Sequence, residues 1–401
     1  MPKHFQAVKV SEHVYWVGAV DWAARDFHGY STPRGTTYNA FLVMAERITL
    51  LDAVKAPFRD EFLTRVASVV DPSEIDLIVS NHSEMDHTGC LLDVAELVKP
   101  SSIVASPMGQ KTIAAQFPGR REVDVVKDGE SLDLGNMKLD FLETRMLHWP
   151  DSMFSYLAAD RVLFSQDAFG MHYATCERFD DQLDPYVLDY EAGKYFANIL
   201  MPYAPLITKL GARLAELDLA LDVVAPDHGP LWRKDISGIV GKYAHWAQQK
   251  PTMKAVIPFD TMWGSTEKLA RSIAEGLHEG GACSRLLPLS GTDRATVATE
   301  MLEAGALILG SPTINNQMFP RMADILSYLN GLKPRNLIGG VFGSFGWSGE
   351  ATGLLTEALE EMRVEVVAEP FRHKFVPDAE VLEAARAWGR GIAEELGRRV
   401  E

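Results

Sequence analysis

The stretch DLIVSNHSEMDH, residues 76–87, joins an apolar run to four side chains that can bind a metal. The run DLIVS has the composition of a buried β-strand. The side chains that follow it are two imidazoles and two carboxylates, His82, Glu84, Asp86 and His87. A single polar residue after a strand usually caps a helix or turn, so the stretch needs support from elsewhere in the chain before it indicates a metal site.

Three other segments of the N-terminal part have the same organisation. Each is an apolar strand pattern with Asp or His just beyond it. They are LDFLETRMLH (139–148), RVLFSQD (161–167) and LDVVAPDH (221–228), which contribute His148, Asp167 and His228. Strands that end at one edge of a sheet bring the following residues together, so we expect all seven side chains to meet at the mouth of a sheet.

The seven side chains comprise four imidazoles and three carboxylates. Imidazole and thiolate suit zinc, whereas a set with more carboxylates is harder and accommodates iron, including ferric iron. The set is sufficient for two metals that each keep an open position. The alternative is that the aspartates cap helices or turns and that the histidines satisfy buried carbonyl groups.

The chain changes its pattern near residue 250. Before it, short strand patterns, turns and helical patterns are mixed. A helical pattern then ends at Pro251 and an apolar strand follows at once, which predicts domains of residues 1–250 and 251–401. Residues 253–401 alternate strand and helix, with five strands in all. This alternation is typical of an α/β domain with a doubly wound parallel sheet.

Three loops of the C-terminal domain follow strands of this sheet. In FDTMWGSTEKLA (259–270) a helix is expected to begin near Thr266, where backbone N–H groups and the helix dipole favour a phosphate. The domain has neither G-x-G-x-x-G nor G-x-x-x-x-G-K-[ST], which argues against a dinucleotide or a nucleoside triphosphate. The other loops are SPTINNQMFP (311–320) and GSFGWSGE (343–350), whose aromatic residues could also be ordinary exposed turn residues.

The N-terminal pattern resembles the metallo-β-lactamase superfamily, whose usual run is His-x-His-x-Asp-His followed by a further His, an Asp and a final His. This sequence departs from it at Glu84, which stands where that run has its second His. The run His-x-Glu-x-Asp-His, in a lactamase-like domain joined to a flavodoxin-like domain, is the signature of the flavodiiron proteins. The resemblance covers essentially the whole chain. It implies an αββα sandwich followed by a flavodoxin-like, doubly wound parallel five-stranded sheet.

The resemblance also implies the cofactors and the residues that bind them. One iron is expected on His82, Glu84 and His148, the other on Asp86, His87 and His228, with Asp167 bridging the two irons. Family members differ in whether the ligand that corresponds to His87 binds directly. FMN is expected in the three loops of the C-terminal domain. The residues implied for it are Thr261, Met262, Trp263, Gly264, Ser265, Thr266, Pro312, Thr313, Ile314, Asn315, Asn316, Ser344, Phe345, Gly346, Trp347, Ser348 and Gly349.

The activity implied is the four-electron reduction of O2 to water. Two ferrous irons and one fully reduced flavin hold four electrons between them, which matches this reaction. The same cofactors suit the two-electron reduction of two NO to N2O, so electron counting does not choose between the gases. His28 and Tyr195 are expected near the diiron pocket as hydrogen-bonding groups, although packing would explain each equally well. Trp149 is expected to shield the metals.

The resemblance implies two kinds of protein partner. Because the flavin and the irons belong to separate domains, a head-to-tail homodimer, or a tetramer built from such dimers, would bring the flavin of one subunit to the irons of the other. The chain has no NADH-binding fingerprint and no C-x-x-C pair. Electrons are therefore expected from rubredoxin or a similar small redox protein.

The composition excludes several other classes of protein. A net charge of -16 argues against a nucleic-acid partner, which requires clustered Lys and Arg. Three widely spaced cysteines fit neither a disulfide framework nor a Cys-based metal site, which favours a reducing cytoplasm. The sequence shows no signal peptide and no run of roughly 18 apolar residues, so no membrane association is expected.

Two further hypotheses remain open at this point. One is a zinc hydrolase of the lactamase superfamily that carries an accessory flavodoxin domain. The other is a flavin electron carrier whose metal domain has degenerated. Glu84 distinguishes the zinc hydrolase from a diiron enzyme, because it replaces a zinc-type ligand with a carboxylate. The electron carrier predicts that Glu84→Ala leaves function intact.

Overall fold

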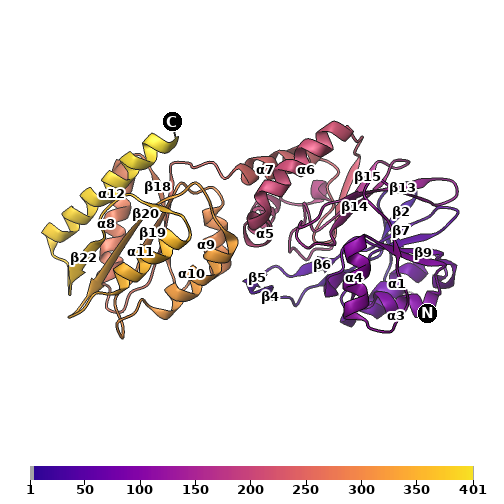
Figure 1. Ribbon diagram of the computed structural model, residues 1–401, viewed down its shortest axis with the longest axis horizontal. Coiled ribbons are helices and arrows are strands. Elements are labelled where there is room, and N and C mark those ends of the chain that lie inside the picture. The colour runs from indigo at the N-terminus through magenta and orange to yellow at the C-terminus, as the bar shows by residue number, and fades with distance from the viewer. Residues whose placement is uncertain (1–3, 401) are drawn as a thin grey trace. The chain divides into compact units, whose positions relative to one another are not determined.

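The computed structural model describes residues 4–400. Its contacts divide the chain into two compact units, each of which is coloured along the chain in Figure 1. The first unit comprises residues up to 28, 32–195 and 205–244, and the second comprises 29–31, 196–204 and 245–401. The domain boundary at residue 250 stays a prediction. In the described part of the chain, no helix combines the length and apolar character needed to cross a membrane.

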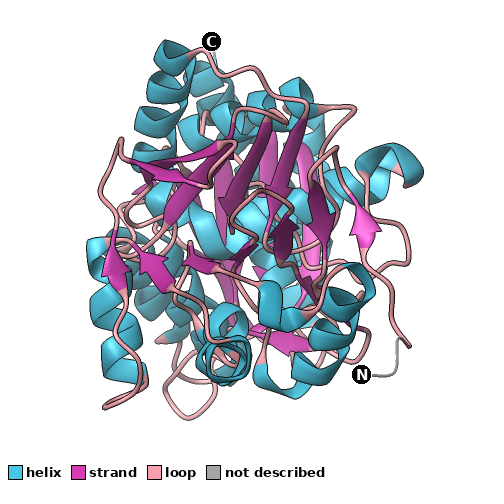
Figure 2. Ribbon diagram, turned by 90° about the vertical axis from the view of Figure 1, so that its right-hand side faces the viewer, coloured by secondary structure: helices cyan, strands magenta, loops and turns pink. Residues whose placement is uncertain are grey.

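The first unit contains two β-sheets that enclose an apolar core. Core side chains come from both sheets, and the rings of Phe41 and Phe164, one from each sheet, have centroids 5.1 Å apart. The order of the seven-stranded sheet is β1-β2-β7-β8-β9-β10-β11, and that of the five-stranded sheet is β12-β13-β14-β15-β16. A second core lies between the seven-stranded sheet and helices on its outer face. These layers belong to the αββα sandwich that the resemblance implies, and Figure 2 distinguishes the strands from the helices.

The bounds of these elements are as follows. The strands of the two sheets are β1 (Val8–Lys9), β2 (Val14–Trp16), β7 (Phe41–Val43), β8 (Thr49–Leu51), β9 (Leu77–Ser80), β10 (Ser102–Ala105), β11 (Asp124–Val125), β12 (Ser131–Asp133), β13 (Lys138–Glu143), β14 (Met153–Leu157), β15 (Val162–Gln166) and β16 (Val223–Pro226). Four short strands lie outside these sheets, β3 (Ala19–Asp21), β4 (Asp26–Phe27), β5 (Tyr30–Ser31) and β6 (Thr36–Tyr38). The helices up to residue 248 are α1 (Arg59–Val69), α2 (Met85–Thr88), α3 (Leu91–Val98), α4 (Pro107–Gln116), α5 (Pro185–Tyr195), α6 (Ala204–Leu217) and α7 (Ile236–Gln248).

The second unit contains one parallel sheet with helices on its faces. The order of its strands is β18-β17-β19-β20-β21, and β22 also pairs with β20. The sequence predicts five strands, and the structure has six because β21 and β22 pair with successive parts of β20. Two helices at opposite ends of the unit's sequence, α8 and α12, pack together against the sheet (Figure 1).

The elements of the second unit have these bounds. The strands are β17 (Lys254–Phe259), β18 (Cys283–Pro288), β19 (Ala306–Gly310), β20 (Ile338–Phe345), β21 (Glu365–Val366) and β22 (Phe371–Lys374). The helices are α8 (Ser265–Glu279), α9 (Arg294–Met301), α10 (Pro320–Leu332), α11 (Ala351–Glu361) and α12 (Ala379–Val400).

Candidate metal centre and ligand cavity

The seven metal-capable side chains of the first unit gather in two adjacent groups. The segments that carry them follow β9, β13, β15 and β16, as the sequence predicts. The first group is His82, Glu84, His148 and Asp167, and the second is Asp86, His87 and His228. Within each group the ligand atoms lie within 4.8 Å of one another, and almost all of these side chains are buried.

The carboxylate of Asp167 faces both groups at once. Its Oδ2 lies 3.2 Å from Nε2 of His82 and 2.8 Å from Nε2 of His148. Its Oδ1 lies 3.6 Å from Nε2 of His87 and 3.5 Å from Nε2 of His228. One oxygen therefore points to each group, which is the arrangement of a carboxylate that bridges two metals.

Each group also has a carboxylate of its own. Oε2 of Glu84 lies 3.3 Å from Nε2 of His82 and 3.2 Å from Nε2 of His148. In the second group, Oδ2 of Asp86 lies 3.3 Å from Nε2 of His87 and 3.2 Å from Nε2 of His228. Both groups therefore offer two imidazoles, one terminal carboxylate and one oxygen of the shared carboxylate.

Glu84 and its neighbours belong to the very short helix α2. Glu84 occupies the N-cap position, yet its side chain makes no capping hydrogen bond in the described structure. The side chain is directed to the imidazoles instead, while the exposed Met85 beside it faces outward. Within this one turn the chain passes from the first group, to which Glu84 belongs, to the second group, to which Asp86 and His87 belong.

Several atoms of the cluster fit a metal better than they fit the protein alone. Among residues 4–400, both carboxylate oxygens of Asp86, both ring nitrogens of His87 and Oδ1 of Asp167 are buried without a hydrogen bond. Leaving a buried polar group unpaired costs about 1–3 kcal/mol, and more if it is charged. Metal coordination would satisfy these atoms, and a set of four imidazoles and three carboxylates suits iron.

The charges of the cluster shift the pKa values of its members in opposite directions. Burial alone would raise the pKa of Asp167, but the neighbouring imidazoles of His82, His148 and His87 outweigh it and hold that pKa well below its ordinary value. Burial likewise opposes a proton on His148, but hydrogen bonds to Asp167 and Glu84 raise its pKa to about 9. Without metal, protons on the imidazoles therefore compensate the carboxylates.

These shifts predict that the metal-free protein loses stability as the pH rises. Because the pKa of His148 rises from 6.5 to about 9 on folding, its proton stabilises the fold fully below pH 6.5, and that contribution is lost as the pH passes 9. The contribution is about 3 kcal/mol. Urea unfolding of the metal-free protein at pH 6.5 and at pH 9 measures the loss. Iron-loaded protein serves as the control, because iron would replace the proton; an equal loss in both forms would contradict the prediction.

Two other residues that the sequence places near the metals lie beside the cluster. His28 Nε2 is 2.9 Å from Oε1 of Glu84, and the imidazole is 39% exposed, so it connects the cluster with the surface. The buried Tyr195 has its ring centroid 6.1 Å from that of His228. Trp149 packs edge-on to His82 at 5.5 Å, where it covers one side of the first group.

Sequence reasoning missed two buried residues that also contact the ligands. His172 lies with its ring centroid 4.7 Å from that of His228, and its Nδ1 is 2.7 Å from Oγ1 of Thr36. Burial, helped by the charge of His228, lowers its pKa well below 6.5, so this imidazole is neutral. Asp151 contacts Nδ1 of His82 at 3.2 Å. Neither residue directly follows a strand, so only their closeness in sequence to Asp167 and His148 could have suggested them.

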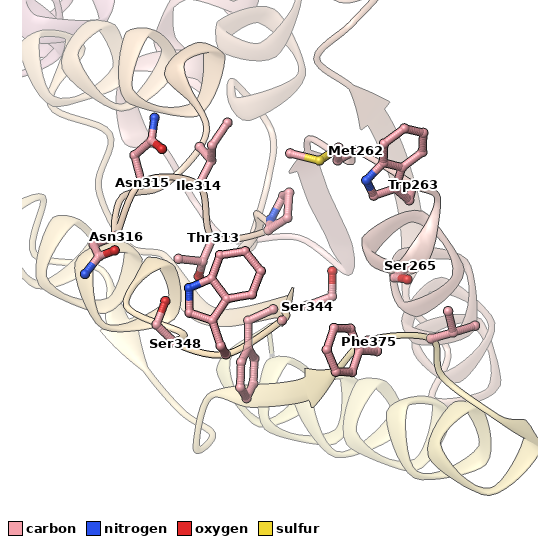
Figure 3. A pocket seen from close by; sticks show the side chains of 15 residues that line it. Met262, Trp263, Ser265, Thr313, Ile314, Asn315, Asn316, Ser344, Ser348 and Phe375 are labelled. Carbon is pink, nitrogen blue, oxygen red and sulfur yellow. The ribbon is translucent and has the colours of Figure 1, made fainter.

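The second unit has a cavity of about 470 Å³ at the carboxyl edge of its sheet. Figure 3 shows Met262, Trp263 and Ser265 on one side of it and Asn315 and Asn316 on the other. All of its lining side chains are uncharged, and apolar ones predominate. Such a volume suits a ligand of cofactor size.

Most of the cavity lining comes from the three loops that the sequence singles out. The lining residues are Met262, Trp263, Ser265, Pro312, Thr313, Ile314, Asn315, Asn316, Ser344, Phe345, Gly346, Trp347, Ser348, Phe375 and Val376. Phe375 and Val376 come from a fourth segment that sequence reasoning missed. Of the expected residues, Thr261, Gly264, Thr266 and Gly349 are not part of this lining. Thr266 lies buried behind it, with its hydroxyl 2.8 Å from that of Ser344.

Comparison with known proteins gives matches over both parts of the chain. The ODP family beta lactamase matches residues 36–229, and flavodoxin matches residues 257–389. A nitric oxide reductase of Moorella thermoacetica is 42% identical, over 98% of this chain and 99% of the relative.

Two solved structures are similar over nearly their full lengths. The rubredoxin oxygen:oxidoreductase from Desulfovibrio gigas is 44% identical, covers 98% of this chain and 100% of its own, and has a TM-score of 0.96. The flavodiiron protein from Giardia intestinalis is 32% identical, covers 100% of this chain and 99% of its own, and has a TM-score of 0.95. These identities and coverages extend the likeness well beyond the metal-binding run.

Proposed function

The chain belongs to the flavodiiron proteins and is an oxidoreductase, and from this premise we propose that it reduces O2 to water at a non-haem diiron site supplied with electrons by FMN. Its flavodoxin domain is the fold that binds FMN, and its cluster of His and Asp residues is consistent with a diiron site. The zinc-hydrolase and electron-carrier alternatives lose their support, because two relatives that match 98% of this chain are named as a nitric oxide reductase and a rubredoxin-oxygen oxidoreductase.

The observation that carries the proposal is the position of Asp167 between the two groups of ligands. Its two oxygens would each bind one iron, with His82, Glu84 and His148 on the first and Asp86, His87 and His228 on the second. When bound, the two ferrous irons supply two electrons and the reduced flavin supplies two more, which is the number needed to convert O2 to water.

The residues around the cluster would control access and protons. His28 contacts Glu84 through Nε2, so it can donate a hydrogen bond to the carboxylate while its exposed side meets solvent. Trp149 would keep water from the first group. Tyr195 is buried with its ring beside that of His228, where it would help to exclude water from the second group. These roles support a dry site in which proton delivery is confined to a few groups.

FMN would occupy the cavity of the second unit. The N-terminus of α8, near Ser265 and Thr266, would hold the phosphate, since it offers backbone N–H groups and the positive end of the helix dipole. The loops at Asn315 and Trp347 would flank the isoalloxazine ring. Thr261, Gly264 and Gly349 would support these loops rather than line the cavity.

Nitric oxide is the second candidate substrate. The relatives similar over the whole chain include both a nitric oxide reductase and a rubredoxin-oxygen oxidoreductase, at 42% and 44% identity. Two adjacent irons would also suit the pairing of two nitrogen atoms. Turnover on the two gases with the same donor would distinguish the substrates.

Two partners complete the proposal. A rubredoxin-type protein would deliver electrons, as the name of the relative from Megalodesulfovibrio gigas indicates for that protein. A head-to-tail homodimer, or a tetramer built from such dimers, would bring the FMN of one subunit to the irons of the other. Exposed aromatic rings at the cavity rim, with Trp263 89% and Trp347 90% exposed, support a protein interface there. A cytoplasmic location would provide such a donor in a reducing environment.

The proposal is tested by metal and flavin analysis of the isolated protein, followed by stopped-flow oxidation of the reduced enzyme. Iron and FMN should be found together, and O2 should reoxidise the enzyme with little peroxide released. Zinc in place of iron, or peroxide in amounts equal to the O2 consumed, would refute it.

Replacing Glu84 by histidine should change the metal that the protein selects. The variant has the His-x-His-x-Asp-His run and one carboxylate fewer, so we expect the ratio of bound zinc to bound iron to rise at least about 10-fold. Metal analysis after expression with both metals measures this ratio. Glu84→Gln is the matched control, because it removes the carboxylate without adding an imidazole and should not gain zinc. An unchanged ratio in Glu84→His would show that Glu84 does not set the metal.

A further inference from the structure

Asp151 is a buried carboxylate in contact with one of the imidazoles of the cluster. Its Oδ2 lies 3.2 Å from Nδ1 of His82 and accepts a hydrogen bond of 2.5 Å from the backbone N–H of Ser83. The side chains of Asp151 and His82 are both fully buried. We propose that Asp151 is a positioning residue, which holds His82 with Nε2 directed at the first metal; this rests on the diiron function proposed above.

The chemistry of the contact fixes one form of the imidazole. An ionised carboxylate only accepts hydrogen bonds, so when His82 gives up one ring proton to bind a metal, the proton that remains must sit on Nδ1. The lone pair is then on Nε2, which faces Oε2 of Glu84 at 3.3 Å and Oδ2 of Asp167 at 3.2 Å. Asp151 thus selects the tautomer that can bind a metal.

The structure holds Asp151 itself in place from two sides. The backbone carbonyl of Asp151 accepts a hydrogen bond of 2.8 Å from the hydroxyl of Ser106, which caps helix α4 by accepting from Gly109 N–H. On the other side, Ser152 N–H donates to the carbonyl of Trp149 and closes a turn around Asp151. The carboxylate is therefore presented to His82 by a rigid segment.

The histidines of the second group have different neighbours at Nδ1. Nδ1 of His228 lies 2.6 Å from the carbonyl oxygen of Thr37, which is a neutral acceptor. Nδ1 of His87 lies 3.7 Å from Oδ2 of Asp227, too far for a hydrogen bond. Asp151 contacts a histidine of the first group only, and the histidines of the second group have other neighbours. Loss of Asp151 should therefore affect the first group and spare the second.

Two substitutions separate the hydrogen bond of Asp151 from its charge. Oδ2 makes both contacts, whereas Oδ1 is buried without a hydrogen bond in the described structure. In Asp151→Asn the amide oxygen can therefore replace Oδ2 while the amide nitrogen replaces Oδ1. Asp151→Ala removes both contacts.

The experiment measures the affinity of the full-length, FMN-containing protein for ferrous iron, combined with Mössbauer spectra of the iron-57 form. We expect Asp151→Ala to weaken one of the two iron-binding steps by about 10–100-fold and to change only one of the two iron signals. Asp151→Asn should restore the affinity to within about 3-fold of the wild type. Equal affinity in the alanine variant and the wild type would overturn the proposal, and so would an asparagine variant as weak as the alanine variant.

Asp160→Ala is the matched control. Asp160 also contacts a histidine, with Oδ1 2.6 Å from Nδ1 of His13. It lies before the beginning of β15, whereas Asp167 of the cluster lies just after the end of that strand. Its replacement should leave both iron-binding steps unchanged. FMN content and circular dichroism show whether each variant is folded. A wild type that binds zinc instead of iron would refute the proposed function, whereas a wild type with both irons and an unaffected alanine variant would refute only the role of Asp151.

Discussion

Replacing Asp167 by alanine is expected to remove iron from both groups at once and to abolish gas reduction. The carboxylate supplies one oxygen to each group, so its loss takes a ligand from both. Loss of a residue that merely supports a ligand weakens metal binding by about 10–100-fold, so loss of a shared ligand should exceed about 100-fold. Iron analysis and O2 consumption with reduced donor measure the two effects.

The control for this variant is Asp167→Asn. A carboxylate can bind two metals through its two oxygens, whereas an amide has one oxygen and can bind one metal. The asparagine variant should therefore keep more iron than the alanine variant while still losing activity. FMN should stay bound in both, because the cavity belongs to the other unit. If Asp167→Ala retained both irons, the cluster would not be bridged by this residue.

Replacing Ser265 by aspartate is expected to expel FMN while leaving the irons in place. Ser265 lines the cavity at the first position of α8, where a phosphate would lie. Two unit charges about 4 Å apart near a protein surface repel by about 4 kcal/mol, which predicts a loss of FMN affinity of at least about 100-fold. An acidic residue at the start of a helix interacts favourably with the helix dipole, so the substitution should not reduce the stability of the fold. Fluorescence titration of the flavin-free protein with FMN measures the affinity.

Lys268→Gln is the control for the change in charge. Lys268 is an exposed residue of the same helix, and its replacement lowers the net charge by the same amount without entering the cavity. It should bind FMN nearly as the wild type does. Equal affinities in Ser265→Asp and Lys268→Gln would mean that the phosphate does not lie at this helix start.

The sequence predicted much of the fold because its strand signals are local. The apolar runs before His82, His148, Asp167 and His228 correspond to β9, β13, β15 and β16, and the ends of those strands explain why the ligands meet. The interruption of the last strand into β21 and β22 was not predicted, since it depends on how each piece pairs with β20. Pairing of this kind is tertiary and leaves little trace in a short window of sequence.

The site was predicted less completely for the same reason. Ligands that follow strands could be found from a repeated pattern, but Asp151 lies in a turn and His172 in a loop. Their importance comes from contacts with His82 and His228, which bring together residues 69 and 56 positions apart. Phe375 was missed because it follows β22, a strand that sequence reasoning did not predict and whose place in the sheet depends on pairing with β20.

Helix α2 couples the metal to the backbone. Glu84 stands where a residue normally secures the beginning of a helix, yet its side chain serves the cluster instead. An α-helix of only four residues has little intrinsic stability, so coordination bonds would reinforce the hydrogen bonds that Thr88 Oγ1 donates to the carbonyls of Ser83 and Glu84. Delivery of iron to the newly made chain would then stiffen the backbone segment that carries three of the ligands as well as load the site.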